Sequence, residues 1–265
     1  MHPKVSIFDV SIGRFMVYST DDSLNKILLA DGVHEPQVLQ VSEFILKNSG
    51  ARNVLDLGAN IGTYSIPLAM RFPEKGIWGF EIQRNVFYQF CGNVFLNSLS
   101  NIRPINKGVS SFVGEIEIPV VDYSKCWNIG GFSIDALPLT VERGDFPNQS
   151  IVGKERAKVT TLDEIGNGLG DVGLIKLDVE GHEVEVLAGG LEFLEKNGLP
   201  PIVFECWPFE WFREKKIKLF EFFASIGYTT ISKDIGYSNF LAQSPRSSHN
   251  QFLIEDSTIR VLPKN

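Results

Sequence analysis

The chain has 265 residues, of which 43% are hydrophobic and 22% are charged, as in an ordinary folded protein with one large or two small domains. Its 32 acidic and 25 basic residues give a net charge of −7 without a basic stripe, so we expect no nucleic-acid partner. The three cysteines are scattered and lack C-x-x-C spacing, which favours reduced thiols over a disulfide frame or a zinc site. Without a signal sequence or a long apolar run, the chain is expected to be cytoplasmic and free of the membrane.

Residues 1–50 are expected to form an extension with a cap helix ahead of a single main domain, residues 51–265. Phe15–Tyr18 and Ile27–Leu29 flank a polar break, which favours a hairpin or a pair of short strands. A helix is predicted from Glu35-Pro36 to Asn48-Ser-Gly50. The extension either lies over a ligand mouth as a lid or covers the edge of the sheet. Apolar surface on its helix could support a homodimer.

The stretch Asn53–Ser65 has the layout of a strand, a glycine turn and the start of a helix. Backbone N–H groups and a helix N-terminus approach a ligand closely in this layout. The spacing Asp56-x-Gly58-x-x-x-Gly62 differs from G-x-G-x-x-G and from a phosphate-binding Walker loop. An acid before the turn would repel a pyrophosphate, whereas it suits a positive or hydrogen-donating group such as the aminoacyl end of S-adenosylmethionine. Two glycines also occur in such turns for purely steric reasons.

A second buried strand is predicted at Ile77–Ile82, and Glu81 lies near its end, 19 residues beyond Gly62. In Rossmann-like folds an acid at this position accepts hydrogen bonds from the ribose hydroxyls of a nucleoside. The alternative is an ordinary strand-end carboxylate that faces solvent.

The rest of the chain alternates between strands and helices. Further strands are expected at 101–106, 115–121, 173–179, 201–206, 228–231 and 251–254, and helices at about 86–97, 184–194 and 211–223. This alternation predicts an α/β fold with a mostly parallel sheet and helices on both faces. The irregular stretch 122–155 is longer than a plain connection needs, so we expect a substrate-facing loop near Cys126–Ser133 and a mobile part around Glu142–Lys154.

Three predicted strands end in acids, Glu81, Asp178 and Glu205, at the sheet edge where such folds bind ligands. Asp178 is expected to orient the amino end of the cofactor or the acceptor. His182 is the one histidine near this edge, and its titration range suits a base, although a surface histidine is more often a bystander. Glu180 falls in a first helical turn, where the dipole favours a carboxylate without any functional reason. Since D-x-E-x-H spacing does not guarantee that side chains converge, no metal site is predicted.

Aromatic side chains could form a wall beside this edge. Trp127, Trp207, Phe209 and Trp211 would do so if the loop 126–133 folds over the mouth, and aromatic faces suit sugar rings or flat apolar acceptors. Core packing is the simpler explanation for Trp211.

Several pieces of the sequence together resemble the FkbM-type S-adenosylmethionine-dependent methyltransferases. The matching pieces are Val54–Gly62, Glu81, Asn97 with Asn101, Thr161–Asp163, Ile175–Glu183, and Val203–Glu205 with Pro208, in the family's order over roughly residues 35–210. The Asp178-Val-Glu-Gly-x-Glu183 piece is far more specific than the glycine turn, and Asn128-x-Gly130-x-x-Ser133 resembles the family's variable-region signature. Residues 1–34 and about 134–155 carry no match.

The resemblance implies a seven-stranded Rossmann-like sheet with an antiparallel last strand, and methyl transfer to a hydroxyl of a sugar, polyketide or other small metabolite. Motifs and resemblance together predict that S-adenosylmethionine contacts Asp56, Gly58, Ala59, Asn60, Gly62, Thr63, Glu81, Ile82 and Asp178. The expected catalytic residues are Asp178 and His182, and the expected substrate-binding residues are Trp127, Asn128, Ser133, Glu180 and Glu205. The family varies at the position of His182, which weakens the case for that residue as the base.

Two alternatives stay open. A nicotinamide-dependent oxidoreductase shares the strand, the glycine turn and the acid, but it prefers G-x-G-x-x-G. A non-catalytic nucleoside-binding scaffold protein would keep the pocket without turnover.

Overall fold

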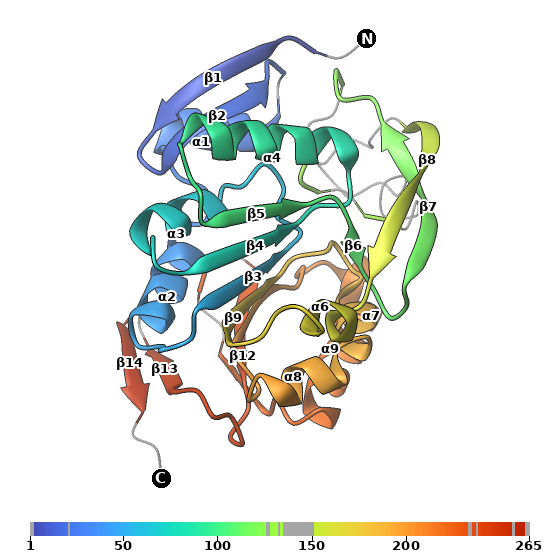
Figure 1. Ribbon diagram of the computed structural model, residues 1–265. Coiled ribbons are helices and arrows are strands. Elements are labelled where there is room, and N and C mark those ends of the chain that lie inside the picture. The colour runs from blue at the N-terminus through green and yellow to red at the C-terminus, as the bar shows by residue number, and fades with distance from the viewer. Residues whose placement is uncertain are drawn as a thin grey trace.

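Figure 1 shows the computed structural model, in which helices cover both faces of a central sheet. The structure describes residues 3–20, 22–125, 128–131, 133–134, 151–232, 235–236, 238–255 and 258–262, apart from the side chain of Trp211. No helix in these ranges has both the length and the hydropathy that a bilayer crossing requires.

The central sheet has seven strands, of which one is antiparallel to its neighbours. Their order is β11 (Thr230–Ser232), β12 (Asn239–Gln243), β10 (Ile202–Glu205), β9 (Val172–Leu177), β3 (Asn53–Leu57), β4 (Gly76–Phe80) and β5 (Ile102–Ile105). β12 runs antiparallel to both β10 and β11, whereas the pairs from β10 to β5 are parallel. The predicted α/β fold, with a mostly parallel seven-stranded sheet and an antiparallel last strand, is confirmed.

The prediction that Gln251–Ile254 is the last strand of this sheet is wrong. β13 (Gln251–Glu255) pairs with β14 (Thr258–Leu262) in a separate hairpin, and β12 takes the place in the sheet. The β12 segment has three apolar residues between two polar ones, which is too short for a clear alternation to reveal a strand.

The helices fall into two groups, each packed on one face of the sheet (Figure 1). The first group is α2 (Pro36–Lys47), α3 (Ser65–Arg71) and α4 (Arg84–Leu96), and the second is α6 (Leu162–Gly166), α7 (Glu183–Ala188), α8 (Leu191–Lys196) and α9 (Arg213–Ser225), preceded by the 3-10 turn η1 (Glu210–Phe212). Because side chains alternate along a strand, Val54 packs in the first core and Leu55 in the second.

The helix predicted over 184–194 is in fact two short helices, α7 and α8. The break falls at Gly189-Gly190, where a Cβ on Gly189 would lie 2.2 Å from the carbonyl oxygen of Ser110. The close approach of that backbone explains the interruption.

The N-terminal extension differs in part from the expectation. β1 (Val5–Val10) and β2 (Gly13–Tyr18) form the expected hairpin, but Ile27–Leu29 lies in a helix, α1 (Ser23–Asp31). Side chains of β2, α1 and α2 share one buried cluster with β3. The apolar face of α2 is buried in that cluster, so it is not the free surface that a dimer would need.

A small three-stranded sheet is inserted between β5 and α6. It consists of β6 (Gly108–Val109), β7 (Gly114–Val121) and β8 (Ile151–Thr160), in the order β6-β8-β7. β7 confirms the strand expected at 115–121. The predicted loop 122–155 is too long, because residues 151–155 belong to β8. Residues 151–154, the end of the predicted mobile part, therefore lie in this strand as well. Residues 142–150 of that part lie outside the described residues.

Two buried carboxyl groups fix the turns at the carboxyl edge of the sheet. Asp56 accepts a hydrogen bond from the Ser65 hydroxyl at 2.6 Å, and Glu183 accepts one from the backbone N–H of Gly181 at 3.0 Å. Burial raises the pKa of Asp56 to about 6 and that of Glu183 to about 7.

We expect the free energy of unfolding to fall as the pH rises from about 4.5 to about 7. The folded state keeps these two protons to a higher pH than the unfolded chain does, and a rise in pKa from 4.5 to about 7 corresponds to about 3 kcal/mol. Glu183→Gln, which removes one of the titrations that burial raises, should make the fall smaller in denaturant unfolding at a series of pH values. Exposed Glu192→Gln should keep the wild-type slope, and a wild-type slope in Glu183→Gln would contradict this account.

Gly58 is required where β3 meets the end of β9. Its φ is +89°, and a Cβ there would lie 1.8 Å from the carbonyl oxygen of Asp178. We expect Gly58→Ala to lower the free energy of unfolding by about 3 kcal/mol or more, because a left-handed backbone and a clash with backbone add together. Gly168→Ala, whose Cβ would meet nothing within 4 Å, should change it by less than about 1 kcal/mol. Equal losses in urea unfolding would refute the steric explanation.

Candidate functional site

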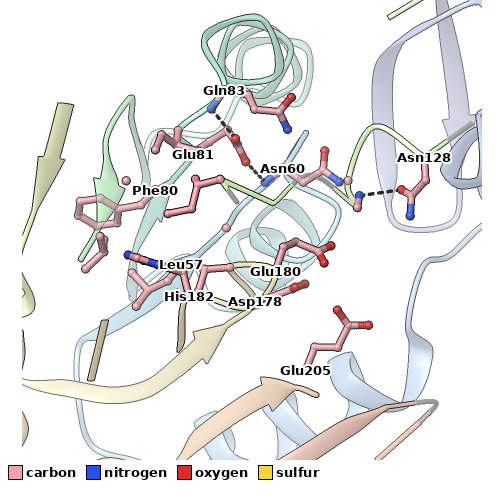
Figure 2. Close-up of a pocket in the computed structure, with 18 of the residues that line it drawn as sticks. Leu57, Asn60, Phe80, Glu81, Gln83, Asn128, Asp178, Glu180, His182 and Glu205 are labelled. Atoms are coloured by element: carbon pink, nitrogen blue, oxygen red, sulfur yellow. Dashed lines mark hydrogen bonds between the residues drawn. The ribbon is translucent and has the colours of Figure 1, made fainter. Parts of the chain in front are cut away.

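A pocket of about 240 Å³ opens at the carboxyl ends of β3, β4, β9 and β10 (Figure 2). Parallel strands collect their carboxyl ends at one edge, so side chains that are distant in sequence meet there. The predicted site residues that line it are Gly58, Asn60, Glu81, Ile82, Asn128, Asp178, Glu180, His182 and Glu205.

Other predicted cofactor residues lie outside the pocket lining. Asp56 is fully buried beneath the glycine turn, where it is the cross-strand partner of Lys176 in β9. Ala59, Gly62 and Thr63 are buried in the turn without lining the pocket. Asp56 therefore supports the turn from below and does not line the pocket, and its contact with the aminoacyl end stays a prediction.

The predicted substrate residues are also divided. Asn128 lines the pocket, whereas Ser133 is buried and does not. Trp127 lies outside the described residues, as does the side chain of Trp211. Trp207 donates from Nε1 to the Glu205 carboxylate at 2.9 Å and packs against Phe212 at 5.5 Å between ring centroids. Neither Trp207 nor Phe209 lines the pocket, and the aromatic wall stays a prediction.

Glu81 joins the glycine turn to the start of α4. One carboxylate oxygen accepts the backbone N–H of Asn60 at 3.0 Å, and the other accepts that of Gln83 at 2.8 Å. Figure 2 shows both bonds. Burial raises the pKa of Glu81 to about 7, although the two N–H donors act against this rise. Asn60 itself has a φ of 50°, so Glu81 holds a left-handed residue at the pocket wall.

Asp178, Glu180 and Glu205 form an acidic group on one side of the pocket (Figure 2). One oxygen of each lies within 4.8 Å of the others, a spacing that could surround a divalent cation, so the expected absence of metal stays a prediction. Lys176, which is 4% exposed, pairs with Asp178 at 2.5 Å between Nζ and Oδ2. Burial, reinforced by the charge of Asp178, raises the pKa of Glu205 well above its ordinary value.

His182 also lines the pocket but is not part of this acidic group. Its Nε2 lies 2.9 Å from the Ser110 hydroxyl, and its Nδ1 lies 3.5 Å from a carboxylate oxygen of Glu185. Both ring nitrogens thus face protein groups, which weakens the case for His182 as a base.

Several residues that line the pocket were not predicted from the sequence. They include Ser23, Leu24, Ile27, His34 and Glu35 of the N-terminal extension, Gln83 at the N-cap of α4, and Lys107 between β5 and β6. Glu35 accepts a hydrogen bond from the Asn239 side chain at 2.8 Å, across 204 positions of the chain. The extension therefore contributes to the lining of the pocket, and its role as a lid stays a prediction. The sequence pattern noted near these residues was Glu35-Pro36, which predicts the start of a helix but does not indicate that the segment lines a pocket.

Comparisons with known proteins agree with this picture. Residues 56–230 match the family model of the methyltransferase FkbM domain. The methyltransferase sdnD of Sordaria araneosa is 24% identical over 163 residues, which cover 51% of this chain and 59% of that protein. The chain thus spans about three fifths of the length of that relative.

Solved methyltransferase structures resemble this chain at low identity, and two of them serve as examples. A precorrin-6y C5,15-methyltransferase from Geobacter metallireducens GS-15 has a TM-score of 0.46 and 13% identity, covering 78% of this chain and 88% of that one. A SAM-dependent methyltransferase from Aquifex aeolicus has a TM-score of 0.42 and 11% identity, and the match covers 77% of this chain and 87% of that one. At these scores the fold assignment rests on the sheet topology itself. Because the family model covers more than half of the sequence, the chain belongs to the FkbM methyltransferase domain family.

Proposed function

We propose that the protein transfers a methyl group from S-adenosylmethionine to a hydroxyl oxygen of a small acceptor, such as a sugar, a polyketide or another hydroxylated metabolite. The observation that carries the proposal is a single pocket in which Asn60, Glu81 and Asp178 meet from three neighbouring strand ends. Membership of the FkbM family supports methyl transfer over the nicotinamide-dependent alternative.

The residues of the pocket fit such a donor. Each carboxylate oxygen of Glu81 accepts one backbone N–H and keeps acceptor capacity for a ribose hydroxyl. Phe80, Ile82 and Val109 offer an apolar surface for an adenine ring. The bound donor supplies a methyl group on a positively charged sulfur, and the acidic group nearby attracts such a charge.

Asp178 is our first candidate for a catalytic role. Its carboxylate is held by the buried Lys176 ammonium, so it offers an oriented negative charge in the pocket. Glu205 also lines the pocket, but burial raises its pKa and so favours the protonated form, which does not take a proton from an acceptor hydroxyl. His182 is the weaker candidate because Ser110 and Glu185 engage its ring. The main contribution of the protein would be alignment of the two reactants.

We also propose that the acceptor is a small molecule and not a nucleic acid. The net charge is −7, and five acidic side chains, those of Glu35, Glu81, Asp178, Glu180 and Glu205, line the pocket. Such a surface would repel phosphates.

S-Adenosylmethionine should stabilise the protein in thermal unfolding. At about 100 times its dissociation constant, a ligand adds roughly 2.7 kcal/mol to the folded state, which for a chain of this size means a rise of about 5–10 °C. NADH at the same concentration should give no rise. A methyl-transfer assay on sugar-bearing and other hydroxylated acceptors, followed by formation of S-adenosylhomocysteine, then distinguishes the enzyme from a non-catalytic scaffold. The absence of any thermal shift would refute the donor assignment.

Glu81→Ala should weaken donor binding at least about tenfold, which corresponds to about 1.4 kcal/mol, because the ribose loses its acceptor and the glycine turn loses its tie. Isothermal titration with S-adenosylhomocysteine measures the dissociation constant, and the exposed Glu115→Ala variant serves as the control. The Glu81→Ala substitution should weaken the binding of an analogue that lacks the 2′-hydroxyl less than it weakens the binding of S-adenosylhomocysteine. Equal losses for both ligands would assign Glu81 to the turn alone.

A further inference from the structure

A hydrogen-bonded clamp joins α1 to residues 128–131, which we call the strap. Asp22 is the N-cap of α1, and one of its carboxylate oxygens accepts the backbone N–H groups of Leu24 and Asn25 at 3.0 and 3.3 Å. Its other oxygen accepts the N–H of Ile129 in the strap at 2.7 Å, across 107 positions of the chain. A single carboxylate therefore caps a helix and holds a distant segment.

The strap is held from a second side by Gln83. The Gln83 side-chain amide donates to the carbonyl oxygen of Ile129 at 3.3 Å and accepts from the Tyr123 hydroxyl at 3.1 Å. The backbone N–H of Gln83 donates to Glu81, the proposed ribose acceptor. Asp22, Gln83 and Ile129 are 1%, 4% and 6% exposed, so water does not replace these bonds easily.

The strap also touches the glycine turn. A Cβ on Gly130 would lie 2.6 Å from the side-chain nitrogen of Asn60, so the strap backbone packs directly on that residue. Within the strap, the N–H of Gly131 donates to the Asn128 side chain at 2.9 Å, as Figure 2 shows. Asn128, Gly130 and Gly131 line the pocket together with Ser23, Leu24 and Ile27 of α1.

We propose that Asp22 is a positioning residue that locks α1 and the strap into one wall of the pocket, and that this wall encloses the methyl donor beside Asn60 and Glu81. The second part of the proposal rests on the proposed function. Asp22 lies outside the pocket lining, so it acts through the two segments that it joins.

The two roles of Asp22 can be separated by substitution. Ser is as good an N-cap as Asp, but its hydroxyl is too short to reach Ile129 as well, so Asp22→Ser keeps the cap and loses the clamp. Asp22→Ala loses both. Thr161→Ala removes the N-cap of α6, at a distance from the strap, and is the matched control for loss of a cap alone.

Hydrogen exchange and titration with S-adenosylhomocysteine together test the proposal. In Asp22→Ser we expect amides 128–131 to exchange at least tenfold faster, α1 amides to stay within about twofold of the wild type, and the dissociation constant to rise at least fivefold. Asp22→Ala should also accelerate exchange in α1, and Thr161→Ala should leave the strap and the dissociation constant unchanged. If Asp22→Ser does not fold, Asp22→Asn, which keeps one acceptor oxygen and the side-chain size, replaces it.

Wild-type exchange of the strap in Asp22→Ser would overturn the clamp. Faster exchange with an unchanged dissociation constant would overturn the positioning role and leave Asp22 a purely structural residue. A wild-type protein that binds no S-adenosylhomocysteine would refute the proposed function, and with it the enclosure of the donor, whatever the exchange rates.

Discussion

One buried ammonium group, that of Lys176, controls the electrostatics of the pocket edge. Lys176 lies opposite Asp56 in the pairing of β9 with β3, contacts Asp178 at 2.5 Å and lies 5.6 Å from the centre of the Tyr64 ring. Burial alone would favour the neutral amine, but the carboxylates of Asp178, Glu35 and Asp56 together raise the pKa of Lys176 above its ordinary value. More carboxyl groups than cations surround it. The surplus is eased by a proton on Glu205, whose pKa burial raises well above its ordinary value, or by a cationic ligand.

The turn after β3 depends on neighbouring strands more than on its own residues. Glu81, from the end of β4, binds the N–H of Asn60, and the carbonyl oxygen of Asp178, from the end of β9, leaves no space for a side chain at Gly58. Three strand ends thus define one another's position. The geometry offered to a ligand is fixed before the ligand arrives, which lowers the entropy lost on binding.

Local patterns in the sequence were enough to predict the sheet and the acidic strand ends. A short apolar run followed by glycines, or by an acid, identifies a buried strand and its carboxyl end, and the rules for parallel sheets then bring Glu81, Asp178 and Glu205 to one edge. The face of the sheet to which the Asp56 side chain points could not be predicted in this way. A strand that is buried on both faces shows no alternation of polar and apolar residues that would distinguish one face from the other. Asp22 and Glu35 were missed for another reason. Their partners, Ile129 and Asn239, lie 107 and 204 residues away, and no spacing in the sequence reports such contacts.

The strand order also governs the sequence of events as the chain leaves the ribosome. β3 lies at the centre of the sheet between β4, which follows within 25 residues, and β9, which begins only at Val172. Until β9 has been synthesised, β3 has one open edge, and Leu55 and Leu57 lack the core that β9 and the helices after it provide. The sheet is then completed by β12, at residues 239–243, close to the end of the chain. Pairing over such sequence distances is slow and leaves apolar strands exposed, so nascent chains that stop before β9 should be prone to aggregation.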